Sequence, residues 1–338
     1  MPFCTLQVLD RQVRINIIFI ICQFETSRNN KNFFTQTAWR AIITSIENQI
    51  IQLEVKAMSY KIVVDSCCEL PEELKNDPHF ERIPLGLQVG DYMIEDDENF
   101  DQKDFLRRVA ESEECAKSSC PSPLRFAESF EGEAEHIYVV TLSSKLSGSY
   151  NSAVLARTMY LEEHEDTSKS IYICDSESAS GGECHYALLA RELEEQGNLS
   201  FSQIVEQLEQ MKEELKTYFV LDNLETLRKN GRLSGLKAMV ASKLSIKPVM
   251  AGDHGSIVER AKAIGTKKAL SQLAQIIQQE VKDSAKRKLI ITHCNCMARA
   301  EEMKNLLTAK MEFAEILIMD MGGLSTLYAN DGGIIVTV

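Results

Sequence analysis

The chain has 338 residues, of which 44% are hydrophobic, and its formal net charge is −13. This length predicts two domains with sizeable cores. A surface this acidic repels phosphate backbones and anionic lipid headgroups, which excludes nucleic acid and membrane surfaces as expected partners.

Ten cysteines are scattered along the chain and include the vicinal pair Cys67-Cys68. Because secreted disulfide scaffolds are normally much shorter, this distribution indicates reduced thiols and a cytoplasmic protein. The most apolar stretch, residues 15–22, is far shorter than the roughly 20 residues that cross a bilayer. We therefore expect no stable membrane insertion.

Residues 1–57 differ from the remainder in composition, with six basic residues against four acidic ones and the only tryptophan, Trp39. A new pattern begins at Met58, where a short strand follows at once. We expect residues 1–57 to be an extension that is poorly ordered and lies outside the main fold. A genuine accessory segment is the alternative.

Strands and helices alternate from residue 58 onward. Strands are predicted at residues 60–66, 137–141 and 171–175, and helices at residues 149–161, 183–195, 201–215 and 223–229. Short apolar strands that alternate with helices indicate an α/β fold with a mostly parallel sheet. We assign this part, residues 58–220, to an N-terminal α/β domain.

The last third of the chain changes character, because two strands follow each other directly around Gly252 to Gly255. The predicted elements are strands at 247–250 and 256–263, a helix at 268–282, a strand at 289–292, a helix at 298–310, and strands at 315–319 and 334–338. A hairpin beside strand–helix units predicts a mixed sheet. Residues 221–338 are therefore expected to form a second α/β domain.

The segment SSKLSGSYNSA, residues 143–153, follows a predicted strand and opens a predicted helix. This places Ser147, Gly148 and Ser149 at a helix N-terminus, where unpaired N–H groups and the helix dipole favour an anion. Glycine there lets a ligand approach the backbone closely. Simple capping by Ser147 or Ser149 explains the pattern equally well.

A nucleophilic serine is a further hypothesis for this segment, with Ser143 or Ser144 beside Lys145. No GxSxG motif surrounds these serines, and no histidine and acid stand out as triad partners. The chain also lacks the phosphate-binding patterns GxxxxGK[ST] and GxGxxG, so nucleotide binding is not indicated.

Three smaller motifs have ordinary structural explanations. Residues 118–123, SSCPSP, fit a loop with an N-cap, although they gather hydroxyl groups. Gly231 fits the position after a helix end, which leaves Arg232 exposed on a turn. Residues 293–296, HCNC, could bind a soft metal, but a strand end with small buried thiols is favoured and no metal is expected.

The order of these motifs resembles one known family. The matching segments are Asp65-Ser66, SSCPS from Ser118, SSKLSGSYNSA from Ser143, Asp175-Ser176, LETLRKNGRLS from Leu224, and Lys247-Pro248. Over residues 58–338 the chain is similar to the DegV family of bacterial fatty-acid-binding proteins. The resemblance implies two α/β domains with a long-chain fatty acid buried between them, and no other cofactor.

In the better-studied members the resemblance also implies a partner, the catalytic subunit of a bacterial fatty acid kinase, which phosphorylates the bound acid to an acyl-phosphate. Carried over by position, the carboxylate contacts fall on Ser118, where the family usually has threonine, and on Ser147 and Gly148. Arg232 matches an arginine associated with kinase docking. Tyr328 stands where the family has a histidine, and its phenol can also donate a hydrogen bond.

Such a site is physically reasonable. A buried carboxylate must be hydrogen-bonded, and some 15 methylenes at about 0.8 kcal/mol each supply on the order of 12 kcal/mol before association costs. Hydroxyl groups and helix-end amides would hold the headgroup without a fixed positive charge. We therefore expect a binding subunit without catalytic residues of its own. The alternatives are a serine hydrolase or acyl transferase that uses Ser147, and a lipid carrier or sensor without a kinase.

Overall fold

The computed structural model describes residues 60–233 and 246–338. The chain divides into two compact units, residues 1–56 and 57–338, and the architecture below is that of the second. The expected extension, residues 1–57, lies outside the described residues.

A four-stranded parallel sheet is the first layer of this unit, in the order β2-β1-β6-β7. Its strands are β1 (Tyr60–Asp65), β2 (Phe80–Ile83), β6 (His136–Thr141) and β7 (Ser170–Asp175). Side chains alternate between the two faces of a strand. Accordingly Val63 packs with α4 (Pro123–Glu128) and α5 (Ser149–Glu163), whereas Ile62 and Val64 pack with α6 (Gly181–Gln196) and α7 (Phe201–Glu214).

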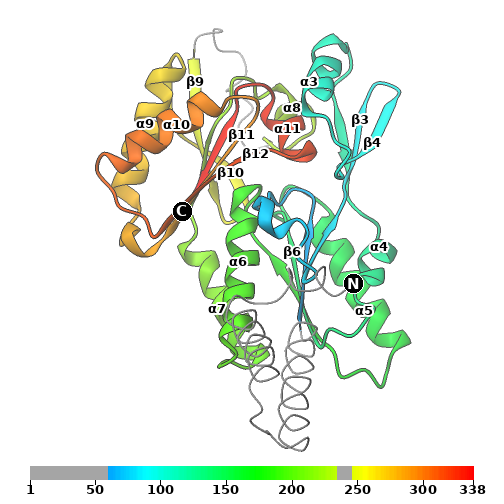
Figure 1. Ribbon diagram of the computed structural model, residues 1–338. Helices are drawn as coiled ribbons and strands as arrows, with labels where there is room; N and C mark the ends of the chain where they lie inside the picture. Colours follow the sequence, from blue (N-terminus) through cyan, green and yellow to red (C-terminus); the bar gives the residue numbers. More distant parts are fainter. Residues whose placement is uncertain (1–59, 234–245) are drawn as a thin grey trace, which may run out of the picture. The chain divides into compact units, whose positions relative to one another are not determined.

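A six-stranded mixed sheet follows, in the order β10-β9-β8-β13-β11-β12. Its strands are β8 (Thr217–Val220), β9 (Ile246–Asp253), β10 (Ser256–Ile264), β11 (Lys288–His293), β12 (Glu315–Asp320) and β13 (Ile334–Thr337). Only β11 and β12 pair in parallel within it. Two helices, α9 (Thr266–Glu280) and α10 (Met297–Thr308), lie together against one face of this sheet (Figure 1).

A small antiparallel sheet, β4-β3-β5, completes the layers. It consists of β3 (Gly86–Val89), β4 (Tyr92–Glu95) and β5 (Lys117–Ser119). Leu87 of β3 packs against Phe105 of α3 (Gln102–Glu111) and against Leu324 of α11 (Gly323–Ala329). The remaining helical pieces are α8 (Glu225–Lys229), η2 (Glu72–Leu74) and η3 (Ser284–Lys286).

Helix α6 contacts both large sheets. A Cβ atom on Gly181 would lie 2.7 Å from Ile290 Cγ2 of β11, so only glycine fits at this crossing. One turn later, His185 Nε2 lies 3.2 Å from Thr337 Oγ1 of β13. On its other side α6 packs against β1 and β6. The two sheets therefore share core residues through this helix.

The predicted fold class is confirmed, since a parallel sheet and a mixed sheet follow each other along the chain. The boundary drawn between residues 220 and 221 stays a prediction, and β8, just before it, pairs within the mixed sheet. Strand β8, the small antiparallel sheet and helix α11 were not predicted from the sequence.

Candidate ligand-binding site

A pocket with about 870 Å³ of empty space, part of it open to solvent, lies on the face of the mixed sheet opposite α9. Successive side chains of β8 point to opposite faces of the sheet. Thr217 and Phe219 face the pocket, whereas Tyr218 and Val220 face the core beneath α9. Its apolar wall includes Leu142, Leu146, Phe219, Leu227, Ile257 and Ile335.

Two aspartates fix the loop between β6 and α5, which borders the pocket. Asp65, fully buried at the end of β1, accepts hydrogen bonds from Leu142 N at 3.0 Å and from Ser149 Oγ at 2.6 Å. Asp175, at the end of β7, accepts from Ser144 N at 3.0 Å. The carboxyl ends of parallel strands meet at one edge, which is why both aspartates reach the same loop. Burial raises the pKa of Asp65, and these hydrogen bonds offset part of that rise.

The start of α5 lies where the sequence predicts it. The helix begins at Ser149, with Gly148 as the N-cap residue. Ser147 lines the pocket, and its Oγ accepts from Ser149 N at 3.2 Å. Gly148 is exposed, and a Cβ atom on it would lie 3.1 Å from Cys120 Sγ. The hydroxyl of Ser149 is committed to Asp65, so Ser147 is the serine of this turn that faces the pocket.

A second polar contact comes from elements far apart in the sequence. Ser118 Oγ of β5 and the phenolic oxygen of Tyr328 on α11 lie 3.0 Å apart, and both residues line the pocket. The two hydroxyl groups form one hydrogen bond between them, and each oxygen keeps further bonding capacity. The structure thus brings together two of the residues that the resemblance assigns to the carboxylate.

Arg232 is half-buried, so the prediction that it is exposed is wrong. Its Nε donates to Leu146 O at 3.0 Å, and its guanidinium carbon lies 5.7 Å from the centre of the Tyr328 ring. The turn itself is as predicted, because Gly231 has a φ of +78° directly after α8. Arg232 also lines the pocket, so a fixed positive charge stands near the hydroxyl pair, contrary to expectation.

A sequence model described as "Uncharacterised protein, DegV family" matches residues 59–337. The chain belongs to the DegV family. Two further comparisons agree. A DegV domain-containing protein of Streptococcus pyogenes is 36% identical over 283 residues, which cover 82% of this chain and 98% of that protein. The solved structure of a DegV-family protein from Ruminococcus gnavus, refined with vaccenic acid, is 48% identical with a TM-score of 0.80, and the match covers 83% of this chain and 99% of the other.

A third relative is described by its role in an enzyme. It is the Streptococcus pneumoniae fatty acid kinase (Fak) B3 protein, whose structure was solved with linoleic acid bound. It is 33% identical to this DegV-family chain with a TM-score of 0.75, and the match covers 83% of this chain and 99% of that one.

In the part of this chain that the structure describes, no helix combines the length and the apolar character that a membrane span requires.

The HCNC segment of this DegV-family chain forms a strand end. His293 ends β11, and the buried Cys294 exchanges backbone hydrogen bonds with Gly332 and Gly333 beside β13. Burial raises the pKa of Cys294 to about 12, which keeps it a neutral thiol. Within residues 60–233 and 246–338, no group of three or more His, Cys, Asp or Glu side chains is arranged to hold a metal ion.

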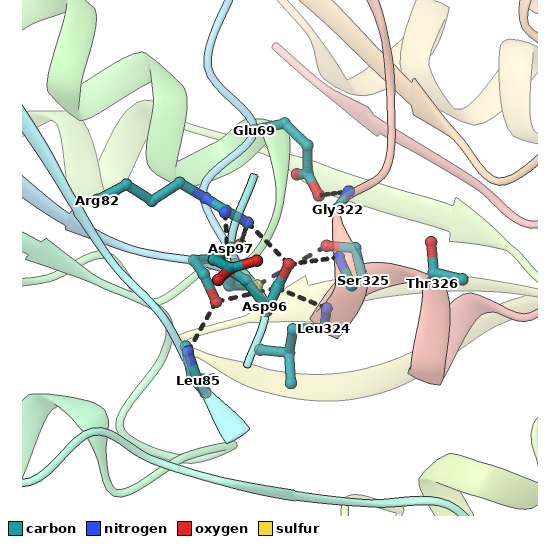
Figure 2. Close-up of polar contacts among 12 residues, drawn as sticks. Glu69, Arg82, Leu85, Asp96, Asp97, Gly322, Leu324, Ser325 and Thr326 are labelled. Atoms are coloured by element: carbon teal, nitrogen blue, oxygen red, sulfur yellow. Dashed lines mark hydrogen bonds and ion pairs between the residues drawn. The ribbon is translucent and has the colours of Figure 1, made fainter. Parts of the chain in front are cut away.

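Two structural features at this site were not predicted from the sequence: strand β8 and the contact of Glu69 with the start of α11. Thr217 and Phe219 belong to the short, mostly apolar run TYFVL, which is typical of a buried strand and could have revealed β8. Glu69 follows β1 and accepts from Gly322 N at 3.1 Å, just before α11 (Figure 2). Burial raises the pKa of Glu69 to about 7. No local pattern links residues 69 and 322.

Proposed function

We propose that this DegV-family chain binds a long-chain fatty acid in the pocket and presents its carboxylate to the catalytic subunit of a fatty acid kinase. Ser118, Ser147, Gly148 and Tyr328 would bind the carboxylate. The observation that carries the proposal is an apolar pocket that contains the hydroxyl pair of Ser118 and Tyr328, 3.0 Å apart. Such a combination suits a ligand that is apolar along its length and anionic at one end.

The energetics favour this type of ligand. Some 15 methylenes buried at about 0.8 kcal/mol each contribute on the order of 12 kcal/mol before association costs. A carboxylate in the same pocket needs hydrogen-bond donors, which the two hydroxyl groups and the start of α5 offer. The Arg232 guanidinium adds a favourable charge close to Tyr328.

The relatives support both parts of the proposal. At 48% identity, the R. gnavus structure holds vaccenic acid, and at 33% identity the S. pneumoniae kinase protein holds linoleic acid. For presentation, Gly148 is exposed while Ser147 beside it is half-buried. A carboxylate held at this turn would lie near the surface, within reach of a partner enzyme. Arg232, between the pocket and the surface, remains our candidate for contact with the kinase.

Covalent catalysis by Ser147 has less support. In the described part of the chain, the Ser147 hydroxyl is hydrogen-bonded only to the backbone N–H of Ser149. A nucleophilic serine requires a general base within hydrogen-bond reach. We therefore favour a binding subunit over an enzyme that acts alone. The scattered cysteines favour a reducing cytoplasm as its compartment.

Mass spectrometry of the purified protein tests the proposal directly. Under native conditions the protein should carry one non-covalent lipid, which organic extraction releases as a free long-chain fatty acid. An acyl adduct that survives denaturation would identify a hydrolase or transferase instead. Failure of the delipidated protein to bind added hexadecanoic acid would remove the basis of the proposal. Addition of a fatty acid kinase catalytic subunit and ATP then tests presentation, since acyl-phosphate should form only with this protein present.

A further inference from the structure

Helix α11 begins without a side-chain cap of its own. It is seven residues long, Gly323–Ala329, and its N-cap residue is Gly322, which has no side chain. The first N–H groups of a helix lack intrahelical partners and must find acceptors elsewhere. Those acceptors matter here because Leu324, Ser325, Tyr328 and Ala329 of this short helix all line the pocket.

Asp96, which directly follows β4, supplies the missing acceptors (Figure 2). Its Oδ1 accepts from Gly323 N at 2.7 Å, and its Oδ2 accepts from Leu324 N at 2.8 Å. Two side chains hold the carboxylate from behind, with Arg82 Nη2 at 3.0 Å from Oδ1 and Ser66 Oγ at 2.9 Å from Oδ2. Asp96 itself is fully buried, as are its contacts with Gly323, Leu324 and Ser66, and the contact with Arg82 is partly buried.

The fit at this contact requires the glycine at the start of the helix. A Cβ atom on Gly323 would lie 2.7 Å from Asp96 Oδ1 and 2.6 Å from Leu87 Cδ1. Real Cβ atoms do not approach other atoms so closely, so the carboxylate sits against bare backbone. Arg82 also donates to the backbone oxygens of Asp96 and Ser66, at 2.7 and 2.8 Å, which fixes the loop that carries the carboxylate.

The same residue is tied to the element that carries Ser118. Asp96 directly follows β4, and β3 pairs with β4 on one side and with β5 on the other. Within this sheet Ser118 lies opposite Leu87. Asp96 therefore joins the sheet that holds the Ser118 hydroxyl to the helix that holds the Tyr328 hydroxyl.

We infer that Asp96 is a positioning residue, which sets the 3.0 Å approach of Ser118 Oγ and the Tyr328 phenol and so makes the pocket selective for a carboxylate. The inference rests on the proposed fatty-acid binding. Asp96 is not among the residues that line the pocket, and it acts through the two elements that it joins.

Asp96→Asn tests this role with almost no change in volume. An amide can accept through one oxygen only, so one of the two helix N–H groups would face an NH2 group instead. The probes are hexadecanoic acid and 1-hexadecanol, which differ only at the headgroup. Because hydrogen bonds to a charged group are about twice as strong as neutral ones, affinity for the acid should fall roughly tenfold or more, and affinity for the alcohol by less than about threefold.

A control and two further variants separate positioning from general damage. Asp97→Asn makes the same chemical change at the next residue, whose carboxylate caps only the local turn at Asn99, and should alter neither affinity. Ser66→Ala removes one donor to Asp96, together with the acceptor of Leu85 N, and should lower the acid-to-alcohol affinity ratio by a smaller factor. In a Tyr328→Phe background, Asp96→Asn should have little further effect on acid binding.

The inference is overturned if Asp96→Asn leaves acid binding unchanged, if it weakens acid and alcohol equally, or if its full effect persists with Tyr328→Phe. Should Asp96→Asn not fold, an unchanged acid-to-alcohol ratio in Ser66→Ala overturns it as well. A wild-type protein that binds no hexadecanoic acid would instead refute the proposed function, and the inference with it.

Discussion

Tyr328→Phe removes one oxygen atom from the pocket and leaves the aromatic ring in place. Without ligand, that oxygen forms a neutral hydrogen bond with Ser118 Oγ at 3.0 Å. Its loss should lower the free energy of unfolding by about 0.5–1.5 kcal/mol. In the proposed complex with a fatty acid, the phenol would donate to a charged carboxylate, and such a bond contributes about 1.5–3 kcal/mol. Affinity should therefore fall roughly 10- to 150-fold, a larger effect than the change in stability.

Titration calorimetry of the delipidated protein with hexadecanoic acid measures the affinity, and urea unfolding measures the stability. Tyr92→Phe is the matched control, because the Tyr92 ring lies 3.9 Å below the Arg108 guanidinium and away from the pocket. It should change neither quantity by more than a few tenths of a kcal/mol. A folded Tyr328→Phe protein with wild-type affinity would show that the phenol does not hold the carboxylate.

Three further predictions concern single residues. Ser147→Ala should weaken fatty-acid binding by roughly ten- to a hundredfold and keep its circular dichroism spectrum, because the lost hydrogen bond from Ser149 N costs only about 1 kcal/mol. Unchanged affinity would show that Ser147 only supports the start of the helix. Arg232→Ala should slow kinase-dependent phosphorylation more than it lowers lipid content, and mass spectrometry that finds the lipid lost would show that Arg232 acts mainly in holding the ligand rather than in contact with the kinase. Glu69 has a folded pKa of about 7, so it stays neutral in the fold while the unfolded chain ionises above its ordinary value of 4.5. The free energy of unfolding should thus fall by up to ~3 kcal/mol because of this group as the pH rises from about 4.5 through 7. Urea unfolding at several pH values measures this dependence. It should be weaker in Glu69→Gln and unchanged in the control Glu73→Gln, whose side chain is exposed.

Most strands of the large sheets could be predicted because each is a short apolar run that can be recognised from its own residues. In β1 and β6, consecutive side chains are buried on both faces, and such runs stand out in the sequence. The small sheet was missed because β3, β4 and β5 have only three or four residues, many of them half-exposed. These segments become strands because they pair with one another, and the residues within each segment do not indicate that pairing.

The site was less accessible to local reasoning than the fold. The helix start at Gly148 follows from the chain itself, whereas the pairing of Ser118 with Tyr328 joins residues 210 positions apart. Only the family resemblance suggested it. The error at Arg232 has the same origin, because a residue after a helix end is usually solvated. Here the Leu146 carbonyl and the Tyr328 ring, both from distant segments, partly cover its side chain.

The close packing of α6 has a consequence for how a lipid reaches or leaves the pocket. Because Gly181 has no side chain, β11 packs directly against the backbone of α6, and the same helix also packs on β1 and β6. The two large sheets then cannot separate as rigid bodies without exposing a shared core. In the proposed function, exchange of an acyl chain would instead proceed by small local movements of the pocket wall, and its rate should respond to substitutions in that wall rather than to the stability of the whole unit.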